Sequence, residues 1–217
     1  MKRNLKSFAA VAVLMLVILL YACSNGTQSE SSLAEQSDKI SANESKGKAI
    51  ITFGYEKQPG YASNQFAVWI EDTDGNHIKT LYATRYTANG GYKDRPDSIP
   101  TWVAKSGLAE MQKSELDAIA GATPKAGTLS YAWDLTDASK NTVPSGDYKF
   151  YVEGSLRWKN RVIYSGVITI GDAPVEVYAE AEYIYESSDN QPALSDDSPE
   201  ISMITAVTAN FVPTAEK

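Results

Sequence analysis

Apolar and polar residues alternate with a period of two along most of the chain that follows Ala49. In the segment 66–71, Phe66, Val68 and Ile70 share one face, and the intervening residues face the other way, which is the pattern of a half-buried β-strand. Similar alternation predicts strands over residues 49–55, 77–84, 128–134, 148–153, 162–170, 175–185 and 201–212. About eight strands with short turns predict an all-β, immunoglobulin-like antiparallel β-sandwich.

Two turns can be placed between these strands. The run Asp72-Thr-Asp-Gly-Asn76 supplies residues that tolerate positive φ and predicts a β-hairpin. Its D-x-D-G spacing also resembles the start of a calcium loop, but the later acidic ligands of such a loop are absent. The segment 133–150 is similar to a strand-turn-strand element in the immunoglobulin-like domain of flagellar hook-capping proteins. That likeness concerns the fold and not the function.

Residues 85–127 form an insertion that is unusually long for a loop in a compact sandwich. Its composition is not that of a disordered segment, because it contains Tyr92, Trp102, Leu108 and other large apolar residues. We therefore expect the insertion to pack on one edge of the sandwich and to hold the functional site. Within it, residues 113–120 are predicted to be helical.

The chain begins with the features of an export signal. Basic residues at the start are followed by an apolar run from Phe8 to Ala22, which is shorter than the roughly 20 residues that a transmembrane helix needs. The run ends in Leu20-Tyr-Ala-Cys23, which resembles the lipobox of bacterial lipoprotein precursors. In that family the cysteine receives a diacylglyceryl group and becomes the first residue. The alternative is an uncleaved signal anchor with a free thiol.

These features divide the chain into three parts. Residues 1–22 are the predicted signal peptide, residues 23–47 hold the lipidated Cys23 and a disordered polar tether, and residues 48–213 are the sandwich domain. We expect the domain to sit on the outer face of the cytoplasmic membrane, or in the periplasm or on the outer membrane, depending on the type of cell.

Charge and composition exclude several functions. Residues 1–22 hold three basic and no acidic residues, so their removal changes the formal charge from −7 to −10, which disfavours nucleic-acid binding. His77 is the only histidine, and no phosphate-binding glycine loop is present, so a histidine-based triad or zinc site has little support. We expect a carrier or binding protein rather than an enzyme.

One short motif carries candidate chemistry. The stretch Asp117-Ala-Ile-Ala-Gly-Ala-Thr123 resembles the acceptor motif of extracytoplasmic proteins that receive covalent FMN from a transferase. Asp117, Gly121, Ala122 and Thr123 match that motif, and Ala120 stands where the motif has Ser or Thr. The resemblance implies that FMN is esterified to Thr123. The alternative is an ordinary helix with a capping box at Ser114 and Asp117, ended by Gly121 in a left-handed conformation.

A wider resemblance covers residues 49–212. Five stretches follow one another in an order similar to that in the domain of unknown function numbered 2271. They are Phe66-Ala-Val-Trp-Ile-Glu-Asp, Lys79-Thr-Leu-Tyr, Arg95-Pro-Asp-Ser-Ile-Pro-Thr-Trp, the acceptor-like motif and Trp133-Asp-Leu. This resemblance implies an immunoglobulin-like extracytoplasmic domain associated with flavin transfer and electron transfer.

Two functional hypotheses follow. In the first, Thr123 carries FMN, a transferase and a membrane redox protein are partners, and Tyr92, Arg95 and Trp102 are candidates for an aromatic seat of the flavin ring. The alternative role of these three residues is packing within the loop. In the second, the domain is a cofactor-free binding or assembly module of the cell envelope. An exposed Thr123 favours the first hypothesis, and a buried one favours the second.

Overall fold

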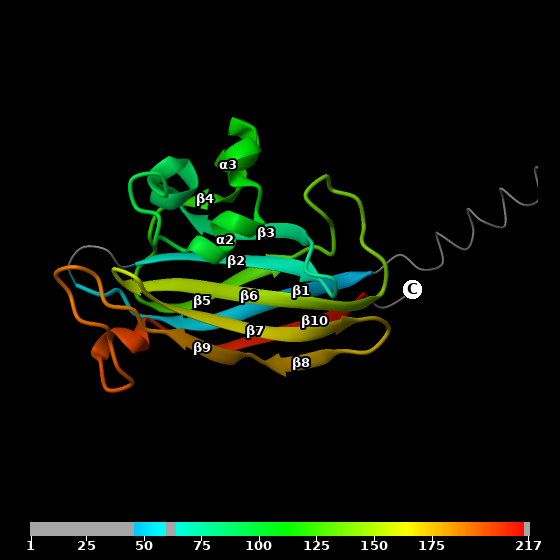
Figure 1. Ribbon diagram of the computed structural model, residues 1–217. Helices are drawn as coiled ribbons and strands as arrows, with labels where there is room; N and C mark the ends of the chain where they lie inside the picture. Colours follow the sequence, from blue (N-terminus) through cyan, green and yellow to red (C-terminus); the bar gives the residue numbers. More distant parts are fainter. Residues whose placement is uncertain (1–45, 60–63, 215–217) are drawn as a thin grey trace, which may run out of the picture. The chain divides into compact units, whose positions relative to one another are not determined.

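The computed structural model describes residues 46–59 and 64–214, which form a β-sandwich covered on one face by a helical layer (Figure 1). The predicted signal peptide, Cys23 and nearly all of the predicted tether lie outside the described residues. The two sheets of the sandwich confirm the predicted all-β fold.

The first sheet has four strands in the order β5-β1-β10-β8. These strands are β5 (Gly127–Trp133), β1 (Gly47–Tyr55), β10 (Ile204–Pro213) and β8 (Val175–Tyr178). All neighbouring pairs in this sheet are antiparallel.

The second sheet has six strands in the order β4-β3-β2-β6-β7-β9. These strands are β4 (Ala120–Gly121), β3 (His77–Thr84), β2 (Gln65–Asp72), β6 (Gly146–Arg157), β7 (Asn160–Ile170) and β9 (Glu180–Ile184). The pairing is antiparallel except for the short β4, which runs parallel to the end of β3.

The segment 175–185, predicted as one strand, is two strands in different sheets. β8 pairs with β10, and β9 pairs with β7. The change of sheet occurs at Ala179, whose backbone N–H donates to the carbonyl of Val207. Apolar and polar residues keep alternating across Ala179 because β8 and β9 both turn one face toward the core. The period of two therefore did not reveal the change of sheet.

The main core lies between the two sheets, with buried aromatic residues from both. Phe66 of β2 contacts Phe53 of β1 edge-on, with ring centroids 5.6 Å apart. Trp133 ends β5 and meets Tyr148 of β6 at 5.0 Å. These contacts bury the inward-facing residues that the period-two pattern identified.

The segment 133–150 forms the predicted strand-turn-strand corner and passes from one sheet to the other. Asp137 accepts a hydrogen bond from the backbone N–H of Asn141 at 2.8 Å, which closes the turn. The indole of Trp133 donates to the carbonyl of Thr136 at 2.9 Å, and the hydroxyl of Tyr148 donates to the carbonyl of Pro144 at 2.8 Å. The corner is therefore fixed by side chains at both of its ends.

The insertion packs across the outer face of the six-stranded sheet, and only its short strand β4 adds to the edge. Its elements are η1 (Thr87–Gly91), α2 (Pro100–Lys105), η2 (Leu108–Glu110), α3 (Lys113–Ile119) and β4. A second core forms beneath them, in which Trp69 and Ala67 of β2 meet Trp102, Ile99 and Leu108 of the insertion. Figure 1 shows α2 and α3 above β2. The expectation of packing on an edge alone was wrong, because the outward-facing residues of β2 are as fully buried as the inward-facing ones and Ala67 and Trp69 among them form part of the second core.

A final short helix, η3 (Pro199–Met203), precedes β10. The helical prediction for 113–120 is confirmed by α3, whereas α2 and the three short helices η1, η2 and η3 were not predicted. Each of these is too short to show a helical period in the sequence.

Candidate functional site

The acceptor-like motif begins on α3, whose start is fixed by a capping box. The backbone N–H of Gln112 donates to the carboxylate of Glu115 at 2.8 Å, and the side chain of Gln112 in turn accepts from the third helical residue. The alternative interpretation placed this capping box at Ser114 and Asp117, which is two positions too far along the chain. Asp117 instead forms an exposed ion pair with Lys113 at 2.6 Å, one helical turn away.

Gly121 does not have the left-handed conformation that a helix-ending glycine would take. It is the last residue of β4 and pairs with Thr84 at the end of β3. A Cβ at position 121 would lie 2.2 Å from Cε2 of Tyr82. Glycine is therefore required here by the close approach of an aromatic ring, and not by backbone torsion.

Thr123 is exposed to solvent. It follows β4 and lies on the crossover that leads from the six-stranded sheet to β5 in the four-stranded sheet. The hydroxyl of Tyr82 donates to the carbonyl of Ala122 at 2.7 Å and fixes the backbone one residue before Thr123. The threonine is thus presented on the surface by a segment that is held on its N-terminal side.

An aromatic cluster lies beneath this crossover. The ring of Tyr82 is 4.8 Å from that of Tyr131 in β5 and 5.0 Å from that of Phe66. Burial raises the pKa of Tyr82 to about 12, and the charge of Arg85 acts in the opposite direction. Tyr82 and Tyr131 therefore close the edge of the sandwich between β3 and β5, directly under the acceptor-like motif.

Sequence reasoning did not single out Tyr82 or Tyr131 as neighbours of the motif. The alternation in 77–84 and 128–134 places each of them in a strand, but a strand pattern does not say which edges of two sheets meet. The signal that could have found Tyr82 is Gly121 itself, since an isolated glycine in a strand marks a close approach.

The profile of a family described as "Predicted periplasmic protein (DUF2271)" matches residues 51–185. The chain belongs to this family. The DUF2271 match contains the whole insertion and the acceptor-like motif, and it confirms the wider resemblance seen in the sequence. No curated protein and no solved structure matches the chain.

The family description places DUF2271 proteins outside the cytoplasm, in agreement with the predicted location. None of the helices in the described part of the chain is both long enough and apolar enough to cross a membrane. Lipid attachment at Cys23 stays a prediction, because that residue lies outside the described ranges.

Trp102 is a core residue of the DUF2271 insertion. Its side chain is fully buried, and its indole N–H donates to Oγ1 of Thr80 at 3.0 Å. Its backbone N–H donates to the buried carboxylate of Glu153 at 2.8 Å. Trp102 therefore packs the helical layer onto the sheet and offers no exposed ring face to a flavin.

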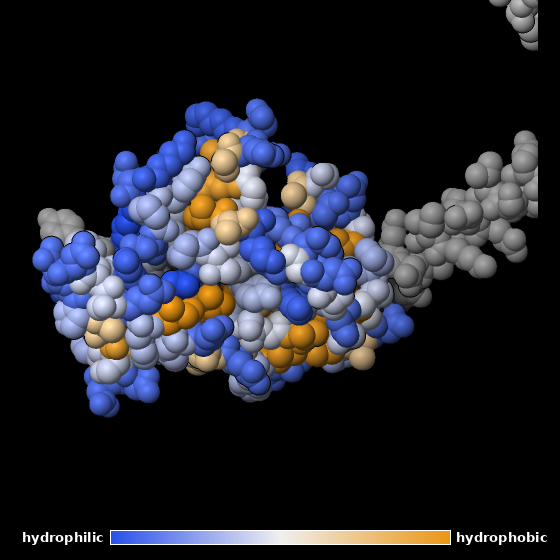
Figure 2. Space-filling model, viewed as in Figure 1, coloured by the Kyte–Doolittle hydropathy of each residue, from blue (hydrophilic) through white to orange (hydrophobic). Residues whose placement is uncertain are grey.

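Tyr92 and Asp117 line the same groove, which has a volume of about 360 Å³ and lies between η1, η2 and α3. The ammonium of Lys93 lies 5.8 Å from the centre of the Tyr92 ring. Figure 2 shows apolar surface exposed among the hydrophilic side chains of this layer. Neither Thr123 nor Trp102 is among the residues that line the groove, so only two of the predicted site residues meet there.

Arg95 lies in the loop between η1 and α2 and retains unused hydrogen-bond donors. Its Nε and Nη2 atoms are buried and have no hydrogen-bond partner. Burial lowers the pKa of Arg95, and Tyr86 and Asp97 oppose this effect. The insertion that contains this loop begins at the end of β3, where Thr84 pairs with Gly121, so Arg95 and Thr123 belong to segments that leave the same end of the sheet.

Among the described residues, no group of three or more His, Cys, Asp and Glu side chains could hold a metal ion. The D-x-D-G run at residues 72–75 is part of the predicted hairpin between β2 and β3. In it, Asp72 accepts hydrogen bonds from the backbone and the side chain of Asn76 at 2.8 and 2.7 Å. The carboxylate of Asp72 thus closes the turn.

Proposed function

We propose that this DUF2271 protein is an extracytoplasmic carrier of FMN, with the flavin esterified to Thr123, and that it acts in a flavin-dependent electron-transfer system of the cell envelope. The observation that carries the proposal is the exposure of Thr123 on a surface crossover directly after the matching residues Gly121 and Ala122. An acceptor hydroxyl has to be accessible to a second protein, because the transferase must bring its own active site onto it.

The chemistry at Thr123 is a phosphoryl transfer. The hydroxyl oxygen of Thr123 forms a bond to the phosphorus of the FMN half of FAD, the pyrophosphate bond breaks, AMP leaves, and the threonine proton is released. Because Gly121 and Ala122 have small side chains, the segment before Thr123 can enter a narrow active site of the transferase. When bound, FMN supplies one-electron and two-electron transfer.

Three residues are candidates to hold an attached flavin. Arg95 has two buried guanidinium nitrogens without partners, which makes it the candidate donor to the flavin phosphate once its side chain turns outward. Tyr82 and Tyr131 are half-buried and supply aromatic surface at the base of the segment. Trp102 is not suited to hold the ring, because it is fully buried.

The predicted lipid on Cys23 supplies the membrane attachment in this proposal. Two or three acyl chains on one residue anchor a protein stably, and the polar tether separates the sandwich from the lipid head groups. The expected partners are the FMN transferase and a membrane redox protein that exchanges electrons with the flavin.

Intact-mass spectrometry tests the assignment. The protein is co-expressed in an exporting host with an FMN transferase, and Thr123→Val is compared with Thr128→Val, which changes another exposed threonine near the crossover. We expect the mass of one FMN on the wild type and on Thr128→Val, and none on Thr123→Val. An unmodified wild type, beside a second acceptor that the same transferase does modify, would reject the proposal.

A second candidate function is a cofactor-free binding or assembly module. The observation that favours it is β8, which pairs only with β10 and leaves its other edge without a strand partner in the described residues. Tyr178 at its end is 73% exposed. An open edge of this kind can accept an added strand from a partner. Loss of partner capture after Tyr178→Asp, with flavin loading unchanged, would separate this function from the first.

A further inference from the structure

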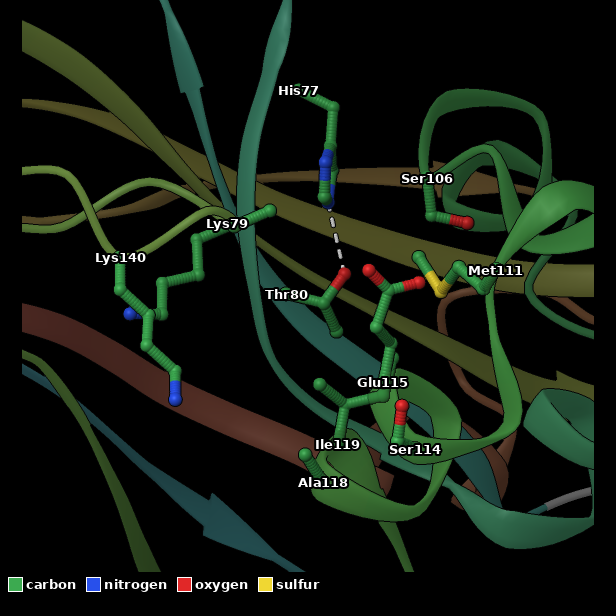
Figure 3. Close-up of a pocket in the computed structure, with 11 residues that line it drawn as sticks. His77, Lys79, Thr80, Ser106, Met111, Ser114, Glu115, Ala118, Ile119 and Lys140 are labelled. Carbon is green, nitrogen blue, oxygen red and sulfur yellow. Dashed lines mark hydrogen bonds between the residues drawn. The ribbon is translucent and has the colours of Figure 1, made fainter.

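A second cavity lies on the other side of α3. It has a volume of about 450 Å³ and is bounded by the first half of β3, by α3 and by the corner turn between β5 and β6 (Figure 3). Its apolar lining comes from Met111, Ala118, Ile119 and Ala138. This size and this mixture of apolar walls with a few polar groups are typical of small-molecule sites.

The walls of this cavity are fixed by hydrogen bonds, so the space is formed in the absence of a ligand. The backbone N–H of Ala138 donates to the carbonyl of Ile78 at 2.9 Å, which ties the corner turn to β3. Lys79 on β3 pairs with Asp134 at 2.7 Å and strengthens the same contact. On the opposite wall, the capping box of Gln112 and Glu115 fixes the start of α3.

Ser106 gives the cavity an unused polar group. The residue lines the cavity, is only 7% exposed, and its hydroxyl has no hydrogen-bond partner. A buried hydroxyl without a partner is unfavourable, and nearly all such groups in folded proteins are satisfied by protein, water or ligand. The hydroxyl oxygen itself is inaccessible to solvent, so an acceptor atom of a ligand would satisfy it after the Ser106 side chain rotates toward the cavity.

Lys140 gives the cavity an unused positive charge. Lys79 is neutralised by Asp134, whereas the ammonium of Lys140 makes no ion pair with any residue of the described ranges. Figure 3 shows both lysines on one side of the cavity and the α3 residues, including the acidic Glu115, on the other. An anionic group is therefore favoured at the Lys140 side and disfavoured near Glu115.

We propose that this cavity binds a small, largely apolar anion, with its negative group toward Lys140 and a hydrogen-bond acceptor toward Ser106. The apolar body of the ligand then packs against Ala118, Ile119 and Met111. The site is separate from the acceptor segment, since Thr123 does not line it, and the proposal does not depend on flavin attachment.

Three matched probes test each part of the site on the full-length protein in one detergent buffer. 6-Methoxy-2-naphthoate has the carboxylate and the acceptor, 2-naphthoate lacks the acceptor, and 2-methoxynaphthalene lacks the carboxylate. Isothermal titration measures their affinities for the wild type and for Ala118→Trp, which fills the cavity. Ala132→Trp adds the same side chain at an exposed position of β5 and serves as the control.

We expect one molecule of 6-methoxy-2-naphthoate to bind, and Ala118→Trp to weaken it at least about tenfold while Ala132→Trp does not. Lys140→Gln should weaken both naphthoates about three- to fivefold and leave 2-methoxynaphthalene unchanged. Ser106→Ala should weaken only the binding of the two methoxy compounds.

Two results would overturn the proposal. One is the absence of saturable binding, and the other is binding that Ala118→Trp leaves intact in a protein with wild-type thermal unfolding. Equal effects of Lys140→Gln on charged and neutral probes overturn the anionic assignment.

Discussion

The ring of Tyr82 occupies the space in which a side chain at position 121 would lie. A Cβ built on Gly121 falls 2.2 Å from Cε2 and 2.9 Å from the hydroxyl oxygen of Tyr82. The same hydroxyl donates to the carbonyl of Ala122, so the tyrosine both packs under the acceptor-like motif and positions its backbone. A glycine that matches a modification motif is therefore also a structural requirement of this edge of the sheet.

Gly121→Ala is expected to destabilise the protein by about 1–3 kcal/mol, because the new methyl group displaces the Tyr82 ring from its contacts with Phe66 and Tyr131. Urea denaturation measures the change in the free energy of unfolding. Gly171→Ala is the control, since a Cβ at Gly171 meets no atom within 4 Å. Equal stability of Gly121→Ala and the wild type would show that Tyr82 moves aside freely.

The strands of the sandwich could be predicted from the sequence because their inward-facing residues are apolar and their period is two. Phe66, Val68 and Ile70 are buried as that pattern requires. The position of the insertion could not be predicted in the same way. The outward-facing Trp69 stacks on Tyr151 of β6 under the helical layer, and such a contact joins residues that are distant in sequence.

The candidate site was predicted in part. Thr123 and its neighbours could be identified because the acceptor-like motif is contiguous in the sequence. Trp102 was named as a possible flavin seat and is instead a core residue, because its burial depends on Thr80 and Glu153 from other strands. Neither the aromatic cluster of Tyr82 and Tyr131 nor the cavity beside Ser106 could be found without the tertiary structure.

Glu153→Gln is expected to change how stability depends on pH. Glu153 is fully buried and accepts hydrogen bonds from the backbone N–H groups of Thr101 and Trp102 at 3.2 and 2.8 Å. Burial raises its pKa above the ordinary value of 4.5, with the bonds from Trp102 and Thr101 and the charge of Arg161 opposing. The folded state thus binds the proton of the Glu153 carboxyl group more tightly than the unfolded state does. The contribution of Glu153 to the free energy of unfolding is therefore complete below pH 4.5 and is lost as the pH rises through the folded pKa.

The measurement for Glu153 is urea denaturation of the wild type and Glu153→Gln between pH 4 and pH 8. The stability advantage of the wild type over the variant should decrease as the pH rises. Glu180→Gln, at an exposed position of β9, is the comparison for removal of a carboxylate at the surface. A wild-type advantage that increases with pH would contradict the raised pKa.

For His77→Gln, the stability difference between the wild type and the variant is expected to depend on pH in the opposite direction. Burial lowers the pKa of His77 from its ordinary value of 6.5, and Glu71 opposes this effect. The unfolded state then binds the proton more tightly, so the wild type loses stability as the pH falls from 6.5 to the folded pKa. His77 is the only histidine, so the difference between the two proteins isolates this titration. A difference in unfolding free energy that does not change between pH 8 and pH 5 would argue against a buried neutral imidazole.

Ala120→Ser is expected to increase flavin loading, because it restores the hydroxyl that the acceptor motif has at this position. Ala120 is partly buried in β4 beside Ala83, and the added oxygen should change the stability by no more than about 0.5–1 kcal/mol. Intact mass after a fixed time with limiting transferase gives the loaded fraction, and the exposed Ala126→Ser, just beyond the motif, is the control. If both serine variants load as slowly as the wild type, the hydroxyl before the glycine is not read by the transferase in this protein. If Ala120→Ser alone loads faster, and the gain disappears in the double variant Ala120→Ser/Thr123→Val, the transferase recognises the motif that ends at Thr123.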